Sequence, residues 1–219
     1  MERSILKADS IEISFDERKI LQGIYLECSQ GEVLGLLGRN GCGKSTMLKI
    51  IFGCVEPGHK YVAIDGVFVK KGYKNCQIAY LPQHHYLPSG IKISKLAKPV
   101  VDPLLWDEFC AFEVYQSYYN KTVTDISGGE WRQIEMLMVL YSRAKFILLD
   151  EPFTHISPIQ VEEFKRIIRD RAQTKGIIVT DHYYKNVLEV SDRLLLISNG
   201  YTEMITNRED LVRYGYLSA

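Results

Sequence analysis

A glycine-rich segment constrains this chain more than any other feature of its sequence. Residues 38–46 read Gly-Arg-Asn-Gly-Cys-Gly-Lys-Ser-Thr, which matches the pattern G-x-x-x-x-G-K-[ST]. The segment follows an apolar run at 33–37, typical of a buried strand, and opens a helical stretch at 44–54. A strand, a glycine-rich loop and a helix in this order predict a loop that binds phosphate groups.

The chemistry of this loop suits an anion. Glycines let main-chain N–H groups close around phosphate oxygens, and the free N–H groups and dipole of a helix N-terminus favour negative charge. We expect Lys44 to reach the β- and γ-phosphates of a nucleotide and the Ser45 hydroxyl to bind Mg²⁺. A chance match in a glycine-rich turn is the alternative, and the strand–loop–helix context argues against it. The predicted nucleotide-binding residues of the loop are Gly38, Asn40, Gly41, Cys42, Gly43, Lys44, Ser45 and Thr46.

The rest of the chain has the composition of an ordinary globular protein. Its 219 residues include 27 Lys and Arg against 27 Asp and Glu, and 46% are hydrophobic. This balance excludes a disordered chain and argues against non-specific nucleic-acid binding, which needs a basic excess. No apolar run approaches the roughly 18–20 residues that cross a bilayer, and residues 1–9 mix charged and apolar side chains without a signal-peptide core. We therefore expect a cytoplasmic protein, with its five cysteines as reduced thiols.

The hydrophobic pattern predicts an α/β fold. Apolar residues alternate at 11–15 and 24–28, which indicates an antiparallel strand pair near the N-terminus. Short continuous apolar runs, typical of strands buried on both faces of a parallel sheet, occupy 33–37, 78–81, 146–149, 177–179 and 194–197. Helical stretches are predicted at 44–54, 129–142 and 159–171. This alternation predicts a layered α/β architecture.

One region departs from that rhythm. No buried strand is predicted between about residues 90 and 124, which we interpret as a helical insertion with Leu105, Phe109, Phe112 and Tyr119 roughly on one face. We expect the aromatic residues of the insertion to lie mostly in the core, with a docking surface for a partner as the alternative.

Two adjacent carboxylates follow the apolar run at 146–149. Asp150 would lie at the carboxyl end of a parallel strand, where ligands bind in open α/β sheets, and its hard oxygens suit Mg²⁺. Glu151 beside it can orient and deprotonate a water molecule. An acidic pair that simply ends a strand before Pro152 is the alternative.

Two further segments narrow the class. Ser127-Gly128-Gly129-Glu130 precedes a helix, and Ser127 with Glu130 fits a helix capping box. A cap does not call for two glycines, which weaken a first helical turn, so we expect a close approach of the backbone to a ligand. The second segment is Thr180-Asp181-His182, at the end of a predicted strand.

In this order the segments resemble the ATP-binding cassette (ABC) ATPases, the nucleotide-binding domains of ABC transporters, from Phe15 to about Gly200. The resemblance implies a P-loop NTPase fold with a mixed, largely parallel core sheet, an N-terminal antiparallel portion and a short helical subdomain at about 90–142. It implies one such domain over 1–219, which binds and hydrolyses ATP with Mg²⁺. The family's nucleotide-binding domains work with separate membrane-spanning subunits.

The resemblance also assigns roles to individual residues. Phe15 matches the aromatic that stacks on adenine, and residues 38–46 match the Walker A loop. Gln83 matches the Q-loop glutamine that contacts Mg²⁺ and senses the transporter. Asp150 matches the Walker B aspartate that binds Mg²⁺, and Glu151 the general base. His182 matches the switch histidine at the γ-phosphate, and Ser127, Gly128, Gly129 and Glu130 form the signature motif.

Family members form head-to-tail dimers in which each ATP lies between the Walker A loop of one subunit and the signature motif of the other. The resemblance therefore implies a homodimer or heterodimer of cassettes at the cytoplasmic face of the membrane. We expect no direct contact with nucleic acid, since the formal net charge is zero. ATP would hold two surfaces together and hydrolysis would release them.

This sequence departs from the family pattern at three places. Glu130 stands where glutamine is commoner, and Ser157 stands where the family usually has an aspartate. His155 replaces a small residue in the same loop, which links the two active sites of a dimer. The helical insertion is also short for the family.

Two other functions fit parts of the pattern. An ABC-type ATPase that acts on nucleic acid or ribosomes usually carries two cassettes, a coiled coil or a zinc module, none of which is evident here. A different P-loop enzyme, such as a GTPase, would leave the signature motif unexplained, and no Asn-Lys-x-Asp element for guanine is present. The adjacent pair His84 and His85 has no apparent third metal ligand, so we interpret it as loop.

Replacing the loop lysine tests the phosphate-binding prediction. Lys44→Ala removes a positive charge from the phosphates, so we expect a loss of nucleotide affinity. Titration calorimetry with ATP measures this directly, and unchanged binding would contradict the prediction.

Overall fold

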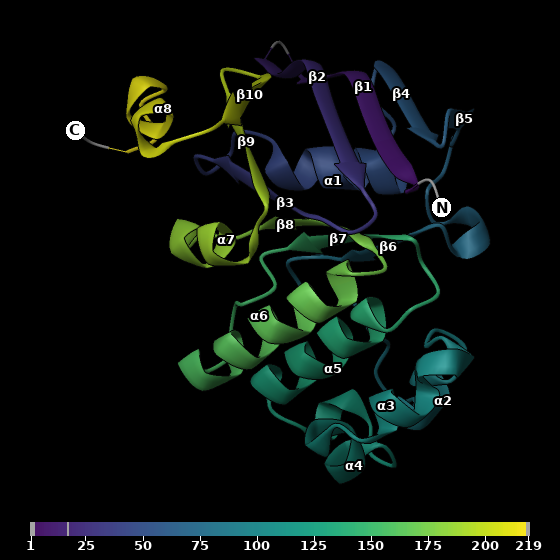
Figure 1. Cartoon of the computed structure of the whole chain (residues 1–219). Coiled ribbons are helices and arrows are strands. Elements are labelled where there is room, and N and C mark those ends of the chain that lie inside the picture. The colour runs from purple at the N-terminus through teal and green to yellow at the C-terminus, as the bar shows by residue number, and fades with distance from the viewer. Residues whose placement is uncertain (1–2, 17, 218–219) are drawn as a thin grey trace.

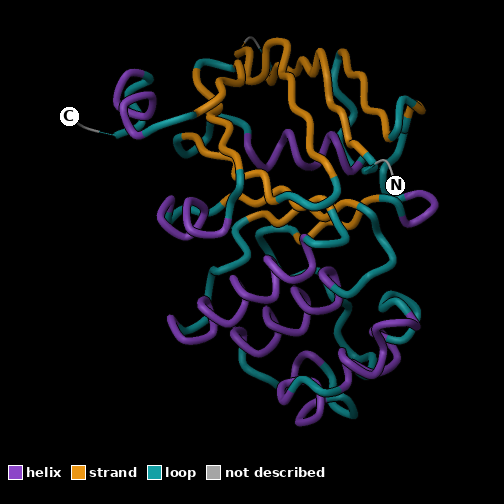
Figure 2. The backbone as a smooth tube through the Cα atoms, in the orientation of Figure 1, coloured by secondary structure: helices purple, strands orange, loops and turns teal. Residues whose placement is uncertain are grey.

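Two sheets and a set of helices make up the structure, a computed structural model that describes residues 3–16 and 18–217 (Figure 1). Met1 and Glu2, part of the N-terminal stretch in which we expect no signal peptide, lie outside the described residues. Within those residues no helix is both long and apolar enough to cross a bilayer. The layers, seen as a backbone tube in Figure 2, confirm the predicted α/β class.

The larger sheet has six strands in the order β10-β9-β3-β8-β7-β6. All neighbouring pairs are parallel except β9 with β10, which are antiparallel. The five predicted buried strands are all present, as β3 (Val33–Gly38), β6 (Ile78–Leu81), β7 (Phe146–Asp150), β8 (Gly176–Thr180) and β9 (Arg193–Ser198). The carboxyl ends of β3, β6, β7 and β8 therefore share one edge of the sheet.

The smaller sheet has four strands in the order β2-β1-β4-β5. The predicted antiparallel pair is β1 (Ile5–Phe15) with β2 (Arg18–Ser29), to which β4 (His59–Ile64) and β5 (Val67–Phe68) are added. Helix α1 (Lys44–Phe52) lies between the two sheets (Figure 1). Apolar side chains of α1, such as Met47 and Ile50, join the inner faces of both sheets in one hydrophobic cluster.

A second hydrophobic cluster lies on the opposite face of the larger sheet. It is formed with α5 (Gly128–Leu140), α6 (Pro158–Ala172) and α7 (Tyr184–Val190), which cover that face (Figure 1). Helices α5 and α6 confirm the predicted stretches within two residues at each end. Besides β4 and β5, the elements that were not predicted from sequence include α7, β10 (Tyr201–Ile205) and α8 (Arg208–Arg213).

The helical insertion is confirmed but is less regular than expected. It is broken into α2 (Ile93–Ala97), α3 (Trp106–Cys110) and α4 (Glu113–Tyr118), so no single face carries the four apolar residues singled out. Phe109 is fully buried, whereas Tyr119 is 51% exposed. Phe109 packs on Tyr115 and Tyr141, with ring centroids 4.7 and 6.1 Å away. Most of the aromatics are thus part of the core that anchors the insertion to α5.

One buried cation joins the far end of the sheet to α5. The Lys175 Nζ donates hydrogen bonds of 2.7 Å to the carbonyl oxygens of Ser142 and Ala144. Burial disfavours the charged form and lowers the pKa of Lys175 from 10.5 to about 8.

This pKa makes stability depend on pH. Between about pH 8 and 10.5 the unfolded chain binds more protons at Lys175 than the folded one, so the free energy of unfolding rises with pH in that window. The slope from this group is at most about 1.4 kcal/mol per pH unit. Urea denaturation of the wild type and Lys175→Met at pH 7.5–9.5 measures it, since the variant lacks the titrating group. Equal slopes in the two proteins would contradict the assignment.

Candidate functional site

A cleft of about 410 Å³ lies at the carboxyl edge of the larger sheet, beside the N-terminus of α1. It brings together most of the residues predicted from sequence. Its lining includes Phe15, Asn40, Gly41, Gly43, Lys44, Ser45, Thr46, Gln83, Glu151 and His182. Phe15 ends β1 and is 52% exposed, which leaves its ring free to pack on a planar ligand at the rim of the cleft.

The glycine-rich loop is held closed by its own lysine. The Lys44 Nζ donates hydrogen bonds to the carbonyl oxygens of Gly38, at 2.7 Å, and Arg39, at 3.3 Å. A Cβ atom on Gly38 would lie 2.5 Å from the Cys42 Sγ, so only glycine fits beneath the loop at that position. Lys44 is 8% exposed, and its ammonium group lies within the ring of main-chain groups that phosphate oxygens would enter.

Asp150 lies directly below this loop. Its Oδ1 accepts a hydrogen bond of 3.0 Å from the Ser45 hydroxyl, and its Oδ2 accepts one of 2.9 Å from the Tyr80 hydroxyl. The carboxylate is thereby fixed from both sides, at the point where β7 ends. Ser45 and Asp150, predicted separately from sequence, are thus adjacent in the fold.

Glu151 lies at the centre of a polar cluster in the cleft. Its Oε2 accepts a hydrogen bond of 2.8 Å from the Gln83 side chain and lies 2.9 Å from the His182 Nε2. Burial raises the pKa of Glu151, and the neighbouring His182 opposes that rise. The carboxylate is therefore a better proton acceptor than a solvent-exposed glutamate, while its Oε1 has no protein partner among the described residues.

The Ser127–Glu130 segment lies outside the cleft. Ser127 and Gly128 are exposed on the surface at the N-terminus of α5. The expected capping box is present: Glu130 N–H donates to the Ser127 hydroxyl at 3.3 Å, and the Glu130 carboxylate accepts from the Ser127 N–H at 2.8 Å. Glu130 also accepts a hydrogen bond from Tyr118, which is the largest cause of its lowered pKa.

The two glycines of this segment have different surroundings, so they are not needed for the same purpose. A Cβ atom on Gly129 would lie 2.9 Å from the His155 carbonyl oxygen, so this glycine allows the chain itself to approach closely. A Cβ atom on Gly128 would meet nothing closer than the His85 Nε2, at 3.8 Å. Only Gly128 therefore leaves an open backbone face to an external ligand.

Sequence reasoning missed a buried arginine that supports the cleft from behind. Arg132, on the second turn of α5, is 1% exposed and donates hydrogen bonds to the main-chain oxygens of Pro82, Asp150, Glu151 and Pro152. A signal was present in the sequence, because Arg132 and Glu135 are charged residues one turn apart in a helical stretch that becomes apolar from residue 136 onward.

The contacts of two other polar residues near the cleft were also not predicted. Tyr80 holds Asp150 as described, and its position inside an apolar strand gave no indication of that contact. Asp181 is buried, and its carboxylate accepts hydrogen bonds from the N–H groups of Tyr183, at 2.9 Å, and Phe153, at 3.4 Å. Asp181 therefore ties the turn that carries His182 to the loop that follows Glu151.

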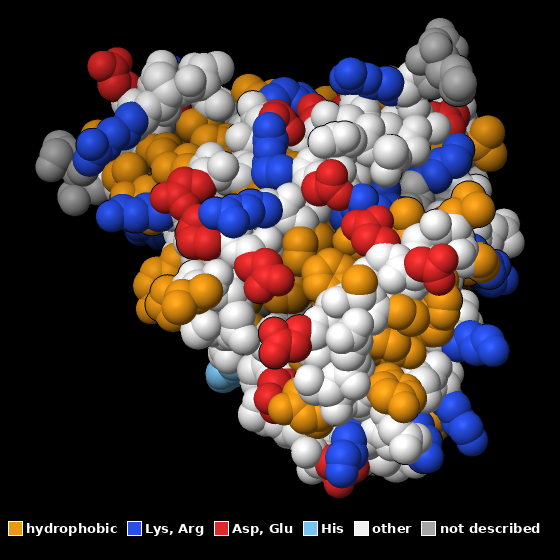
Figure 3. Space-filling view, turned by 60° about the horizontal axis from the view of Figure 1, so that its bottom comes forward, with side chains coloured by type: hydrophobic (Ala, Val, Ile, Leu, Met, Phe, Trp, Pro, Cys, Tyr) orange, Lys and Arg blue, Asp and Glu red, His pale blue; other side chains and the backbone are white. Residues whose placement is uncertain are grey.

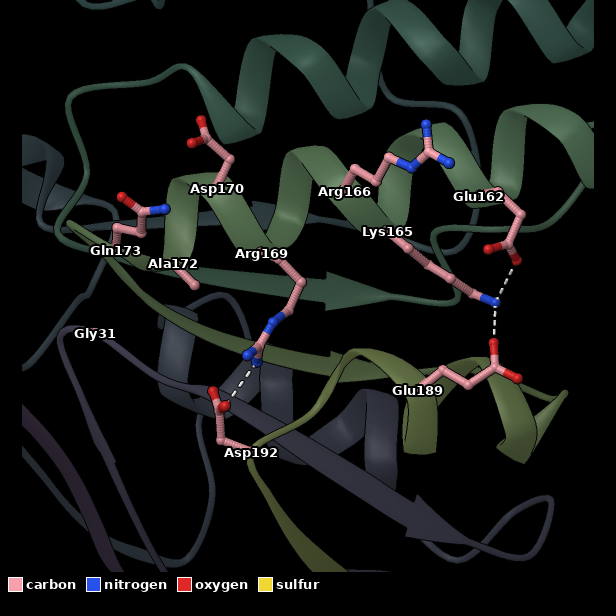
Figure 4. Close-up of a pocket in the computed structure, with 10 residues that line it drawn as sticks. All are labelled: Gly31, Glu162, Lys165, Arg166, Arg169, Asp170, Ala172, Gln173, Glu189 and Asp192. Carbon is pink, nitrogen blue, oxygen red and sulfur yellow. Dashed lines mark hydrogen bonds and ion pairs between the residues drawn. The ribbon is translucent and has the colours of Figure 1, made fainter.

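A larger groove of about 750 Å³ lies elsewhere, along α6 and α7 (Figure 4). Most of its charged side chains are paired, although Arg166 forms no ion pair among the described residues. Lys165 pairs with Glu162, at 2.7 Å, and with Glu189, while Arg169 pairs with Asp192 at 2.6 Å (Figure 4). Paired charges of this kind offer little to a charged ligand, so we assign the function to the smaller cleft.

Comparison with known proteins decides the family. The family model described as ABC transporter matches residues 21–154. This chain belongs to the ABC transporter ATP-binding proteins. The lipopolysaccharide export system ATP-binding protein LptB of Haemophilus influenzae is 31% identical, with 96% of each chain covered. A probable ABC transporter ATP-binding protein of Azorhizobium caulinodans is also 31% identical, over 94% of this chain and 79% of that protein.

Solved structures agree with the fold. An ATP-binding subunit of an ABC transporter superposes with a TM-score of 0.84 at 18% identity, covering 98% of this chain and 95% of the other. A bacterial Atm1-family ABC exporter with ATP bound gives a TM-score of 0.80 at 20% identity, covering 98% of this chain and 41% of the exporter. The predicted P-loop NTPase fold and the transport-coupled ATPase class are confirmed, and the nucleic-acid alternative has no support.

The position of Cys42 in the phosphate loop allows a chemical test of that loop in this ABC ATPase. Burial raises the pKa of the Cys42 thiol, so we expect iodoacetamide to modify it more slowly at neutral pH than the exposed Cys54 and Cys76. The Cys42 sulfur lies against the Gly38 backbone, so we expect an adduct there to distort the loop and abolish ATP binding. Peptide mapping by mass spectrometry, with and without ATP, measures both effects. Modification of Cys42 that ATP does not slow would contradict this placement.

Proposed function

We propose that this chain hydrolyses ATP with Mg²⁺ and drives a separate membrane-spanning subunit through ATP-dependent dimerisation. It acts as a single nucleotide-binding domain over residues 1–219, with a helical subdomain at about 90–142, at the cytoplasmic face of the membrane. The observation that carries the proposal is the convergence of Gln83 and His182 on one oxygen of Glu151 inside the cleft.

The residues beneath the loop fit a magnesium ion. Asp150 and Ser45 place a carboxylate and a hydroxyl 3.0 Å apart, and hard oxygens of this kind are the ligands that Mg²⁺ prefers. Gln83 adds an amide oxygen at the side of the cleft. When bound, the ion neutralises charge that develops on the phosphate oxygens. Tyr80 keeps Asp150 oriented toward Ser45, so the pair is preorganised before nucleotide arrives.

The same arrangement suits hydrolysis. Lys44 and the N–H groups of residues 40–46 hold the phosphates, and Phe15 packs on the base. Glu151 accepts a proton from the attacking water, a role that its raised pKa favours at neutral pH. His182, 2.9 Å from Glu151, holds the carboxylate and reaches the terminal phosphate. Positioning and electrostatics of this kind supply most of the catalysis of phosphoryl transfer.

The exposed Ser127 and Gly128 support a dimer. They lie at a helix N-terminus, which favours an anion, yet they do not line the cleft of their own chain. The terminal phosphate of an ATP bound to a second cassette would complete that anion site. We propose a head-to-tail dimer of identical or different cassettes on this basis.

A face beside Gln83 supports a partner in the membrane. Residues 86–104 carry exposed apolar side chains, which include Tyr86, Ile91, Val100 and Leu104, the last 91% exposed. Figure 3, with the helical end of the molecule brought forward, shows apolar side chains distributed among basic and acidic ones. A partner docked on this segment would contact the chain shortly after Gln83, whose side chain is hydrogen-bonded to Glu151. The relatives named for lipopolysaccharide export support a partner of the exporter kind.

Ser157 has a structural role that explains its place in the loop after Glu151. It is the N-cap of α6, where its hydroxyl accepts a hydrogen bond of 3.4 Å from the Gln160 N–H. Serine caps a helix as well as aspartate does. The replacement therefore preserves the helix start while it removes a negative charge from the loop.

A substitution of the base tests hydrolysis and dimerisation together. Glu151→Gln keeps the hydrogen bond to Gln83 but cannot accept a proton, so turnover falls by about 100-fold or more while ATP binding remains. ATP then accumulates uncleaved, and the variant elutes as a dimer in size-exclusion chromatography with ATP and Mg²⁺. Glu163→Gln, on the exposed face of α6, is the matched control and keeps wild-type turnover. Strictly monomeric elution of Glu151→Gln would contradict the dimer, and retained turnover would contradict the base.

A further inference from the structure

We propose that Arg132 and Glu135, one turn apart on α5, are positioning residues that hold Gln83 and Glu151 in a single rigid unit. The inference rests on the proposed function of those two residues and adds the link between them. We define the Q-loop as residues 82–87 and the base loop as residues 150–152. Both loops are hydrogen-bonded to the same helix, through these two side chains.

Arg132 joins the two loops through their carbonyl groups. Its Nη1 donates 2.7 Å to Pro82, immediately before Gln83, while its Nη2 donates 3.1 Å to Asp150 and 2.9 Å to Glu151. Its Nε completes the set with Pro152, at 3.3 Å. One guanidinium group therefore fixes the main chain on both sides of the Gln83–Glu151 hydrogen bond.

Glu135 holds the other end of the Q-loop. This carboxylate is fully buried, and its Oε1 accepts hydrogen bonds from the N–H groups of Tyr86, at 2.7 Å, and Leu87, at 3.2 Å. Its Oε2 lies 2.9 Å from the His85 Nδ1 and 3.7 Å from the Arg132 Nη1. The charged pair thus holds the Q-loop at both ends: Arg132 donates to its first residue, and Glu135 accepts from its last two residues.

The base loop needs such support because its backbone is strained. Glu151 has a φ of 51°, in the left-handed region that side chains other than glycine rarely adopt. Its N–H is held by the Thr180 carbonyl at 2.9 Å, and its carbonyl is held by Arg132. Strained residues persist only where their surroundings fix them, and this conformation is what aims the Glu151 side chain into the cleft.

Only arginine fits the geometry of this link. A guanidinium group has five N–H donors in a planar fork, so it can bond several carbonyl oxygens in fixed directions. A lysine ammonium keeps the charge but has three donors at one point and cannot reach all four carbonyl groups. Arg132→Lys therefore removes the fork and leaves a buried cation, which separates the positioning role from the charge.

The test compares Arg132→Lys and Glu135→Gln with Lys175→Met in the full-length chain. Lys175 is also a buried cation bonded to carbonyl oxygens, but at the opposite end of β7, so its loss affects stability and not the cleft. We expect Arg132→Lys to lower kcat about 10- to 100-fold, since small misplacements of catalytic groups have effects of that size. KM for ATP and the affinity for a fluorescent ATP analogue stay within about twofold of the wild type.

Hydrogen exchange supplies a second readout that does not depend on turnover. Arg132→Lys speeds exchange in peptides that span the Q-loop and the base loop, Glu135→Gln does so in the Q-loop, and Lys175→Met does so in neither. If Arg132→Lys does not fold, Glu135→Gln decides the question by the same measurements.

Two results would overturn the inference. One is a kcat within twofold of the wild type in Arg132→Lys, or in Glu135→Gln where the first variant does not fold. The other is an equal loss of kcat in Lys175→Met.

Glu151→Gln, assayed in parallel, separates a failure of this inference from a failure of the proposed function. If Glu151→Gln is inactive while the α5 variants are active, only the link between the loops is wrong, and if Glu151→Gln retains turnover, the proposed base is wrong as well.

Discussion

The parallel register of β6, β7 and β8 is the constraint on which the cleft depends. Leu81 pairs with Leu149 and Asp150 pairs with Thr180, so the three strands end at the same level of the sheet. Gln83, Glu151 and His182 each follow the end of one of these strands by one or two residues, so all three lie at the same edge of the sheet. A slip of one residue would turn a side chain to the opposite face and separate this group.

Hydrophobic burial on both faces is what enforces that register. The strands carry almost only aliphatic and aromatic side chains, with Leu148 and Ile178 in one cluster and Leu149 and Val179 in the other. No shift along the strand leaves both clusters filled, so the polar residues that follow are placed by the packing of the apolar ones. The buried polar groups then refine the arrangement, with Tyr80 on Asp150 and Arg132 on the base loop.

The helical insertion and α5 connect this edge to the rest of the molecule. Phe109 and Tyr115 anchor the insertion to α5, and Tyr118 contacts Glu130 in the signature segment. The same helix carries Arg132 and Glu135 to the loops around the cleft. A displacement of the insertion or of the Q-loop by a docked partner therefore has a continuous covalent and hydrogen-bonded path to Glu151.

The sequence by itself determined the phosphate loop, the buried strands, the main helices and the identity of the residues in the cleft. It could do so because those features are local, set by a fixed spacing or by a period of two or about 3.6 residues. The tertiary structure alone decided how the insertion breaks into α2, α3 and α4 and where β10 and α8 pack. In these segments the hydrophobic periodicity is weak, so packing against the rest of the molecule determines the conformation. It also decided that Gly129 accommodates the chain's own His155 carbonyl, and that Arg132 joins segments 50 and 19 positions away in sequence. No local pattern encodes which distant carbonyl groups a buried guanidinium meets.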